Sequence, residues 1–133
     1  MIDYAKFGYL NFRVFFKINY LIQEKFLELI KNISKTGNVT EIVECGGSYD
    51  LLTVFSNRNP SQFNKQFKAL IAQSPKQLKN YDITTSVVSH FYPRAYLLDE
   101  TKEEDIIIGG DREVIKINEL DKDILFYLNE NSK

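Results

Sequence analysis

Apolar side chains occupy every second position between residues 10 and 16, and this alternation restricts the fold more than any other feature of the sequence. A period of two places successive side chains on opposite faces of a β-strand, so we expect residues 9–17 to form one. One face is entirely apolar and consists of Leu10, Phe12, Val14 and Phe16. The opposite face is mixed and consists of Tyr9, Asn11, Arg13, Phe15 and Lys17. The apolar face should lie on a core, and the mixed face should be partly covered as well.

Two later segments have the periodicity of amphipathic helices. In residues 20–34 apolar side chains recur at helical spacing, Asn19 is placed to cap the start, and Gly37 lies where a stop is expected. The second helix begins after Asn59, a cap residue, with Pro60 in the first helical position, and Pro75 ends it. Its apolar face consists of Phe63, Phe67, Leu70 and Ile71.

Three further strands complete the pattern. Residues 39–45 and 49–56 are strand-like and are separated by Gly46-Gly47-Ser48, which predicts a hairpin. A long fourth strand is expected over residues 81–92. The resulting order, βαββαβ, predicts a ferredoxin-like α+β fold, with two helices on one face of a four-stranded antiparallel sheet. We expect the other face to form a homodimer interface through Tyr9, Phe15 and Phe55.

The composition changes after residue 98. Residues 99–117 are expected to form an acidic linker, with a short hairpin between 106–108 and 114–117. Residues 118–133 should carry a last helix that Asn118 caps. The apolar stripe of this helix consists of Leu120, Ile124, Leu125 and Leu128. The predicted organisation is therefore a domain at 1–98, a linker and a C-terminal helix.

Charge and cysteine content exclude several classes of protein. The formal net charge is −1, whereas a free-standing nucleic-acid binder carries a clear basic excess. Cys45 is the only cysteine and His90 the only histidine, which excludes an intramolecular disulfide and argues against structural zinc. The sequence has neither a membrane-spanning apolar run nor a signal peptide. We expect a cytoplasmic protein without metal or cofactor.

Residues 8–96 resemble the effector-binding (RAM) domain of the leucine-responsive, or Lrp/AsnC, family of prokaryotic transcription regulators. The opening IDYAKFGY at 2–9 is similar to the family's entry into its first strand. The segment VECGGSYDLL at 43–52 is similar to its G-x-Y-D-L-L turn, and YDITTSVV at 81–88 to its last strand. The tail INELDKDILFYLNEN at 117–131 resembles the first helix of the family's helix-turn-helix.

The resemblance implies a ligand-sensing and oligomerisation domain. Such domains form dimers through their sheets, assemble further, and bind small effectors, commonly amino acids, between subunits near the G-x-Y-D turn. The effector-binding residues here would be Gly46, Gly47, Ser48, Tyr49 and Asp50. Backbone N–H groups of residues 46–48 would bind a carboxylate and Asp50 an ammonium group. Alternatively, the glycines serve only the turn and Asp50 caps it. DNA would be bound only through helix-turn-helix domains that this chain does not complete.

Two other functions fit the same fold less well. A small ferredoxin-like enzyme would need a catalytic group, but His90 lies within a predicted strand and Cys45 has no base nearby in sequence. A single-stranded nucleic-acid binder could stack bases on Tyr9, Phe15 and Phe55, yet the charge balance argues against it. A stand-alone metabolite-binding module remains an alternative, and we predict that the chain is not an enzyme.

Overall fold

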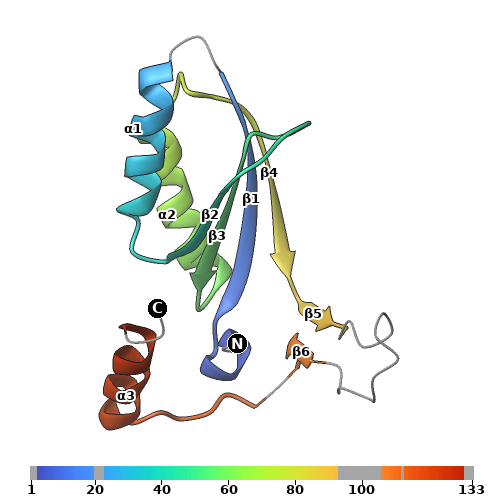
Figure 1. Cartoon of the computed structure of the whole chain (residues 1–133), viewed down its shortest axis with the longest axis vertical. Helices are drawn as coiled ribbons and strands as arrows, with labels where there is room; N and C mark the ends of the chain where they lie inside the picture. Colours follow the sequence, from blue (N-terminus) through green and yellow to red (C-terminus); the bar gives the residue numbers. More distant parts are fainter. Residues whose placement is uncertain (1–2, 20–22, 93–105, 112, 131–133) are drawn as a thin grey trace.

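A four-stranded antiparallel sheet with two helices on one side forms the body of the molecule (Figure 1). The computed structural model describes residues 3–19, 23–92, 106–111 and 113–130. Its elements are η1 (Tyr4–Phe7), β1 (Leu10–Ile18), α1 (Gln23–Ser34), β2 (Val39–Glu44), β3 (Leu51–Asn57), α2 (Pro60–Gln73), β4 (Leu78–Ser86), β5 (Val88–Phe91), β6 (Ile106–Gly109) and α3 (Glu119–Glu130). Among the described residues no helix is long and apolar enough to span a membrane.

The strand order in the main sheet is β2-β3-β1-β4, and every neighbouring pair is antiparallel. The two helices connect β1 to β2 and β3 to β4, so the main body has the order βαββαβ. This confirms the predicted ferredoxin-like α+β fold. β5 and β6 form a separate two-stranded sheet beyond the end of β4 (Figure 1).

The core lies between this sheet and the helices. The alternation in β1 is confirmed, because Phe12, Val14 and Phe16 are buried. Rings from α2 cover them: Phe63 stacks on Phe12 with ring centroids 4.3 Å apart, and Phe67 lies 6.2 Å from Phe16. The whole buried cluster consists of Phe12, Val14, Phe16, Ile18, Leu29, Ile33, Leu51, Phe55, Phe63, Phe67 and Leu70.

The predicted caps of two helices are confirmed. The Asn59 Oδ1 atom accepts a hydrogen bond of 2.8 Å from the Gln62 backbone N–H, with Pro60 in the first turn. At α3 the Asn118 side chain accepts from the Asp121 N–H at 2.7 Å, and Asp121 accepts from the Asn118 N–H at 3.0 Å. The predicted start of the first helix at 20–22 lies outside the described residues.

The structure corrects the predicted position of Phe55. This residue faces the helices, where it is fully buried and its ring lies 5.5 Å from that of Phe63. The strand register explains the error, because Phe55 pairs with Phe12, whose side chain points into the core. Phe15 lies on the opposite, helix-free face and is half-buried. Phe55 therefore belongs neither to a dimer interface on the open face nor to a base-stacking platform.

The predicted fourth strand, residues 81–92, is in fact two strands. β4 ends at Ser86, which pairs with Asn11, and β1 begins only one residue earlier at Leu10, so β1 cannot pair with the rest of the predicted strand. β5 then pairs with β6 in register from Val88–Gly109 to Phe91–Ile106. The predicted hairpin between 106–108 and 114–117 is therefore wrong. Residues 93–105, which include most of the acidic part of the predicted linker, lie outside the described residues.

Two of the three aromatic residues of the predicted interface, Phe15 and Phe55, should differ sharply in their effect on stability. Phe55→Ala removes a fully buried ring and should lower the free energy of unfolding by about 3–5 kcal/mol. Phe15→Ala removes a half-buried ring and should cost about 1 kcal/mol. Urea denaturation followed by circular dichroism measures both. Equal losses of unfolding free energy for the two variants would contradict the assignment of Phe55 to the core and Phe15 to the open face.

Candidate effector-binding turn

The turn between β2 and β3 contains the five residues that the sequence proposes for effector binding. Gly46, Gly47 and Ser48 are exposed, and Gly47 has a φ of +110°, a conformation that favours glycine. Among the residues that the structure describes, the backbone N–H groups of these three residues have no hydrogen-bond partner. The turn therefore presents free donors to its surroundings, as the carboxylate-binding part of the prediction requires.

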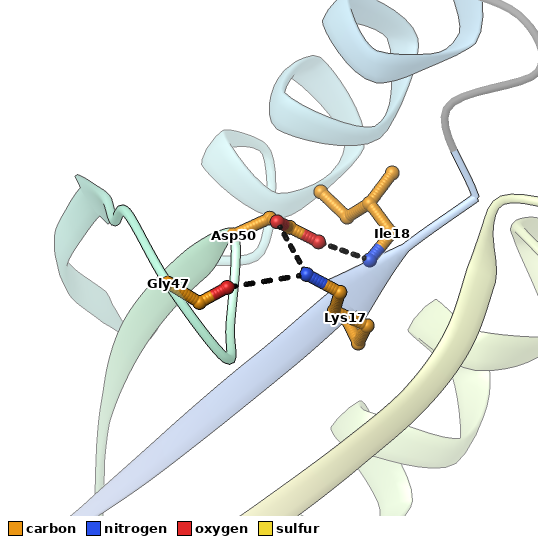
Figure 2. Close-up of polar contacts among 4 residues, drawn as sticks. All are labelled: Lys17, Ile18, Gly47 and Asp50. Atoms are coloured by element: carbon orange, nitrogen blue, oxygen red, sulfur yellow. Dashed lines mark hydrogen bonds and ion pairs between the residues drawn. The ribbon is translucent and has the colours of Figure 1, made fainter.

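Asp50 differs from its neighbours because it is buried. Its side chain is 7% exposed, and both carboxylate oxygens bind groups at the end of β1 (Figure 2). Oδ2 accepts a 2.8 Å hydrogen bond from the Ile18 backbone N–H, and Oδ1 accepts one of 3.0 Å from the Lys17 Nζ. Lys17 Nζ also donates to the Gly47 carbonyl oxygen at 3.3 Å. One lysine thus joins the exposed turn to the buried carboxylate.

The position of Asp50 explains why a carboxylate suits it. The last residue pair between β1 and β3 is Phe16–Leu51, and the Asp50 N–H still donates to the Phe16 carbonyl oxygen at 2.9 Å. The Asp50 side chain then accepts from the Ile18 N–H. This bond continues the hydrogen bonding of β1 beyond Leu51, the first residue of β3. These two bonds of the carboxylate go to β1 and not to the turn of Asp50 itself. The predicted role of Asp50 in binding an ammonium group stays a prediction, and the geometry gives the carboxylate a structural role.

Tyr49 connects the same turn to the far edge of the sheet. Its hydroxyl donates a hydrogen bond to the Asp82 carboxylate on β4, and its ring lies 5.5 Å from that of Phe15. This hydrogen bond to a carboxylate is the main cause that raises the pKa of Tyr49 above its ordinary value, with desolvation and the Asp82 charge acting in the same direction. The phenol therefore stays protonated as a donor.

Lys17 is the residue that sequence reasoning missed. It was placed on the mixed face of the first strand, with no sign that it reaches the turn 30 residues later in the chain. Only the antiparallel pairing of β1 with β3 brings them together. The signal in the sequence is weak, since a lysine at the end of a strand is common.

The two groups considered for catalysis come from different parts of the fold, since His90 lies in β5 and Cys45 follows β2. The exposed His90 ring stacks on Tyr92 with centroids 6.2 Å apart, and the Cys45 thiol lies 3.7 Å from the Val43 carbonyl oxygen. Within the described ranges, no group of three or more His, Cys, Asp or Glu side chains is placed to hold a metal ion.

No family model matches the sequence, and no curated protein matches it significantly. Solved structures match the fold. An AsnC family transcriptional regulator from Agrobacterium tumefaciens is 15% identical with a TM-score of 0.57, over 65% of this chain and 56% of that one. This chain shares its fold with an AsnC-family transcription regulator.

Two other structures agree with this fold. PH0061 is 14% identical with a TM-score of 0.55, over 80% of this chain and 62% of that one. The transcriptional regulator NMB0573 of Neisseria meningitidis, solved in complex with L-Met, is 13% identical with a TM-score of 0.51, over 62% and 52%. The chain thus spans between about half and three fifths of the length of these proteins. At this level of identity the likeness shows the fold.

Replacing Asp50 should destabilise the protein. Asp50→Ala leaves the Ile18 N–H without its acceptor and should lower the free energy of unfolding by about 2 kcal/mol. Asp50→Asn keeps an acceptor for the Ile18 N–H but places an amide NH2 donor opposite the Lys17 ammonium group. It therefore loses the ion pair and its hydrogen bond and should cost about 1 kcal/mol. Urea denaturation of both variants provides the measurement. An Asp50→Ala protein as stable as the original would contradict the structural role of the carboxylate.

Proposed function

We propose that this chain is the ligand-sensing and oligomerisation domain of an Lrp/AsnC-type transcription regulator, with DNA contacts made by attached helix-turn-helix domains. The observation that carries the proposal is the helix-free face of the sheet. Both α1 and α2 lie on the other side (Figure 1). A sheet face that keeps apolar side chains without a covering helix is typical of a surface that binds a partner.

Apolar side chains form a row across this open face. The register pairs Val43 with Leu52, and Leu52 with Phe15, on three adjacent strands. Val43 is 37% exposed, and the other two are half-buried. A second copy that places the same row against this one would bury additional apolar area, at about 25 cal/mol per Å². Because the same patch serves both copies, the contact suits a two-fold symmetric homodimer.

The effector, commonly an amino acid in the family that the sequence resembles, would bind at the turn 46–50 near a subunit boundary. The free N–H groups of Gly46 to Ser48 and the Lys17 ammonium group suit the carboxylate of such a ligand. Asp50 would position Lys17 for this contact. The L-Met complex of the Neisseria regulator, a protein of similar fold, supports this class of ligand.

The C-terminal helix fits attachment to a DNA-binding unit. Leu120, Ile124 and Leu128 of α3 are exposed, so these three members of the predicted apolar stripe are uncovered by the residues that the structure describes, and the Leu125 side chain lies outside that description. In a helix-turn-helix such a stripe packs against the following helices. We therefore assign DNA binding to complete helix-turn-helix domains joined to the sensing domain.

The proposed interface predicts a homodimer that a single charged substitution on the open face should disrupt. The protein should sediment as a dimer at micromolar concentration, and Phe15→Arg should weaken association at least about tenfold, because it replaces an apolar ring of the interface with a charged side chain that must be desolvated. Leu27→Arg is the matched control, since Leu27 is 61% exposed on α1, away from the open face. Analytical ultracentrifugation distinguishes them. A monomeric original protein, or equal effects of both variants, would contradict the interface.

Effector binding can be tested by titration calorimetry with the twenty common amino acids. At least one should bind, and Lys17→Met should abolish that binding by removing the cation at the turn. Lys65→Met, on the exposed side of α2, should leave it unchanged. If no amino acid binds the original protein, the proposed effector site is wrong.

A further inference from the structure

We propose a second ligand site that takes a small 2-hydroxy acid with an apolar side chain. It lies at the start of β1, whereas the turn 46–50 lies beside the other end of this strand. The site is a pocket of about 180 Å³ between η1, the start of β1, the end of β4 and the β5–β6 pair. It shares no lining residue with the turn 46–50, so it does not depend on the function proposed above.

The pocket is large enough for a small organic molecule. An engineered cavity of about 150 Å³ in another protein holds benzene, which sets the scale for this one. The lining is mainly apolar, with a few polar groups, as is usual for sites that bind metabolites. Its apolar wall includes Leu10, Val87, Phe91 and Ile108.

Specific hydrogen bonds hold the walls of the pocket together. Asp3 Oδ1 accepts from the Ala5 N–H at 3.1 Å and from the Gly109 N–H at 3.2 Å, which fixes β6 against η1. The Gly110 N–H donates to the Val87 carbonyl oxygen at 2.8 Å. Gly109 has a φ of +90°, and a Cβ atom there would lie 2.7 Å from the same carbonyl oxygen. The close approach of β6 therefore requires glycine.

The charge of the lining favours an anion. Arg13 is the only charged side chain among the described residues that line the pocket. A second cation is near, because the Arg58 guanidinium lies 5.4 Å from the ring centroid of Tyr9, which also lines the pocket. A guanidinium group binds a carboxylate through two parallel hydrogen bonds. The Asp3 carboxylate is bound by the N–H groups of two lining residues, Ala5 and Gly109, and is not itself part of the lining, so the charge that the lining presents is that of Arg13.

Asn11 adds a requirement for a hydrogen-bond donor. Its Oδ1 atom is buried and has no hydrogen-bond partner among the described residues, although the side chain lines the pocket. A buried acceptor without a donor is unfavourable, and a small rotation of the Asn11 side chain toward the pocket would expose this oxygen, so a ligand that supplies an O–H group there gains affinity. Asn11 and Arg13 lie two residues apart on the same face of β1, about 7 Å along the strand. The long arginine side chain spans part of that distance.

These features together define the ligand class. The carboxylate of the ligand binds Arg13, and a neutral hydroxyl on the neighbouring carbon donates to Asn11. The apolar chain of the ligand packs against the wall near Phe91. The hydroxyls of Ser86 and Ser89, which lie 3.3 Å apart in the lining, offer further partners for the carboxylate. A 2-amino acid has the same skeleton, but its ammonium group adds a positive charge beside Arg13.

The test is calorimetry on the full chain with three acids of one carbon skeleton. The probes are 2-hydroxy-4-methylpentanoate, 4-methylpentanoate and 2-amino-4-methylpentanoate. The hydroxy acid should bind, and the other two should bind at least about tenfold more weakly. In a nuclear magnetic resonance titration, the amide signals of Gly109 and Gly110 should shift with the hydroxy acid. Because the proposed turn site also takes amino acids, the three acids are compared in the Lys17→Met protein. No binding of the hydroxy acid to that protein at millimolar concentration, or tighter binding of the amino acid than of the hydroxy acid, would overturn the proposal.

Variants assign the binding to this pocket. Arg13→Gln should weaken binding of both acids without an amino group, whereas Asn11→Ala should weaken only the hydroxy acid, at least about tenfold. Circular dichroism should show that both variants fold. Lys17→Met alters the turn 46–50 and should leave hydroxy-acid binding intact. If Lys17→Met abolishes that binding and Arg13→Gln does not, the ligand binds at the turn and this proposal is wrong.

Discussion

The central position of β1 is the constraint on which the rest of the structure depends. The strand pairs with β3 on one side and β4 on the other, so both edges of its backbone are hydrogen-bonded. One of its faces consists of buried aromatic and aliphatic side chains, which must be covered by helices. The other face remains open, and the two ends of β1 meet the only two groups of polar side chains to which we assign ligands. Fold, interface and sites are all organised along this strand.

The sequence predicts β1 well because apolar side chains occupy every second position between residues 10 and 16. It also predicts the element order and the caps at Asn59 and Asn118, since these depend on local chemistry. The prediction fails in β3, where apolar residues occupy both faces and alternation does not decide which side chain points inward. A shift of one residue moves a whole strand to the other face. Phe55 was placed wrongly for this reason.

The remaining errors concern pairing over long distances in the chain. The break after Ser86 follows from where β1 begins, which is set by a segment more than 70 residues earlier. For the candidate site, the turn itself was predicted, but the partners of Asp50 were not, because they lie 32 and 33 residues away. The pocket beside Asn11 combines segments from both ends of the described chain. No local pattern in the sequence reveals such a combination.

The contacts between η1 and the segment around β6 have a mechanical consequence. Asp3 binds the Gly109 N–H, and the Lys6 carbonyl oxygen accepts from the Ile115 N–H at 2.7 Å. The chain therefore closes on itself just outside the main sheet, ahead of β1 and behind β6. Tension applied through the two ends of the chain reaches these few hydrogen bonds before it reaches the β1–β3 and β1–β4 ladders. The strength of this junction, more than that of the main sheet, would decide how the molecule first yields to such a force.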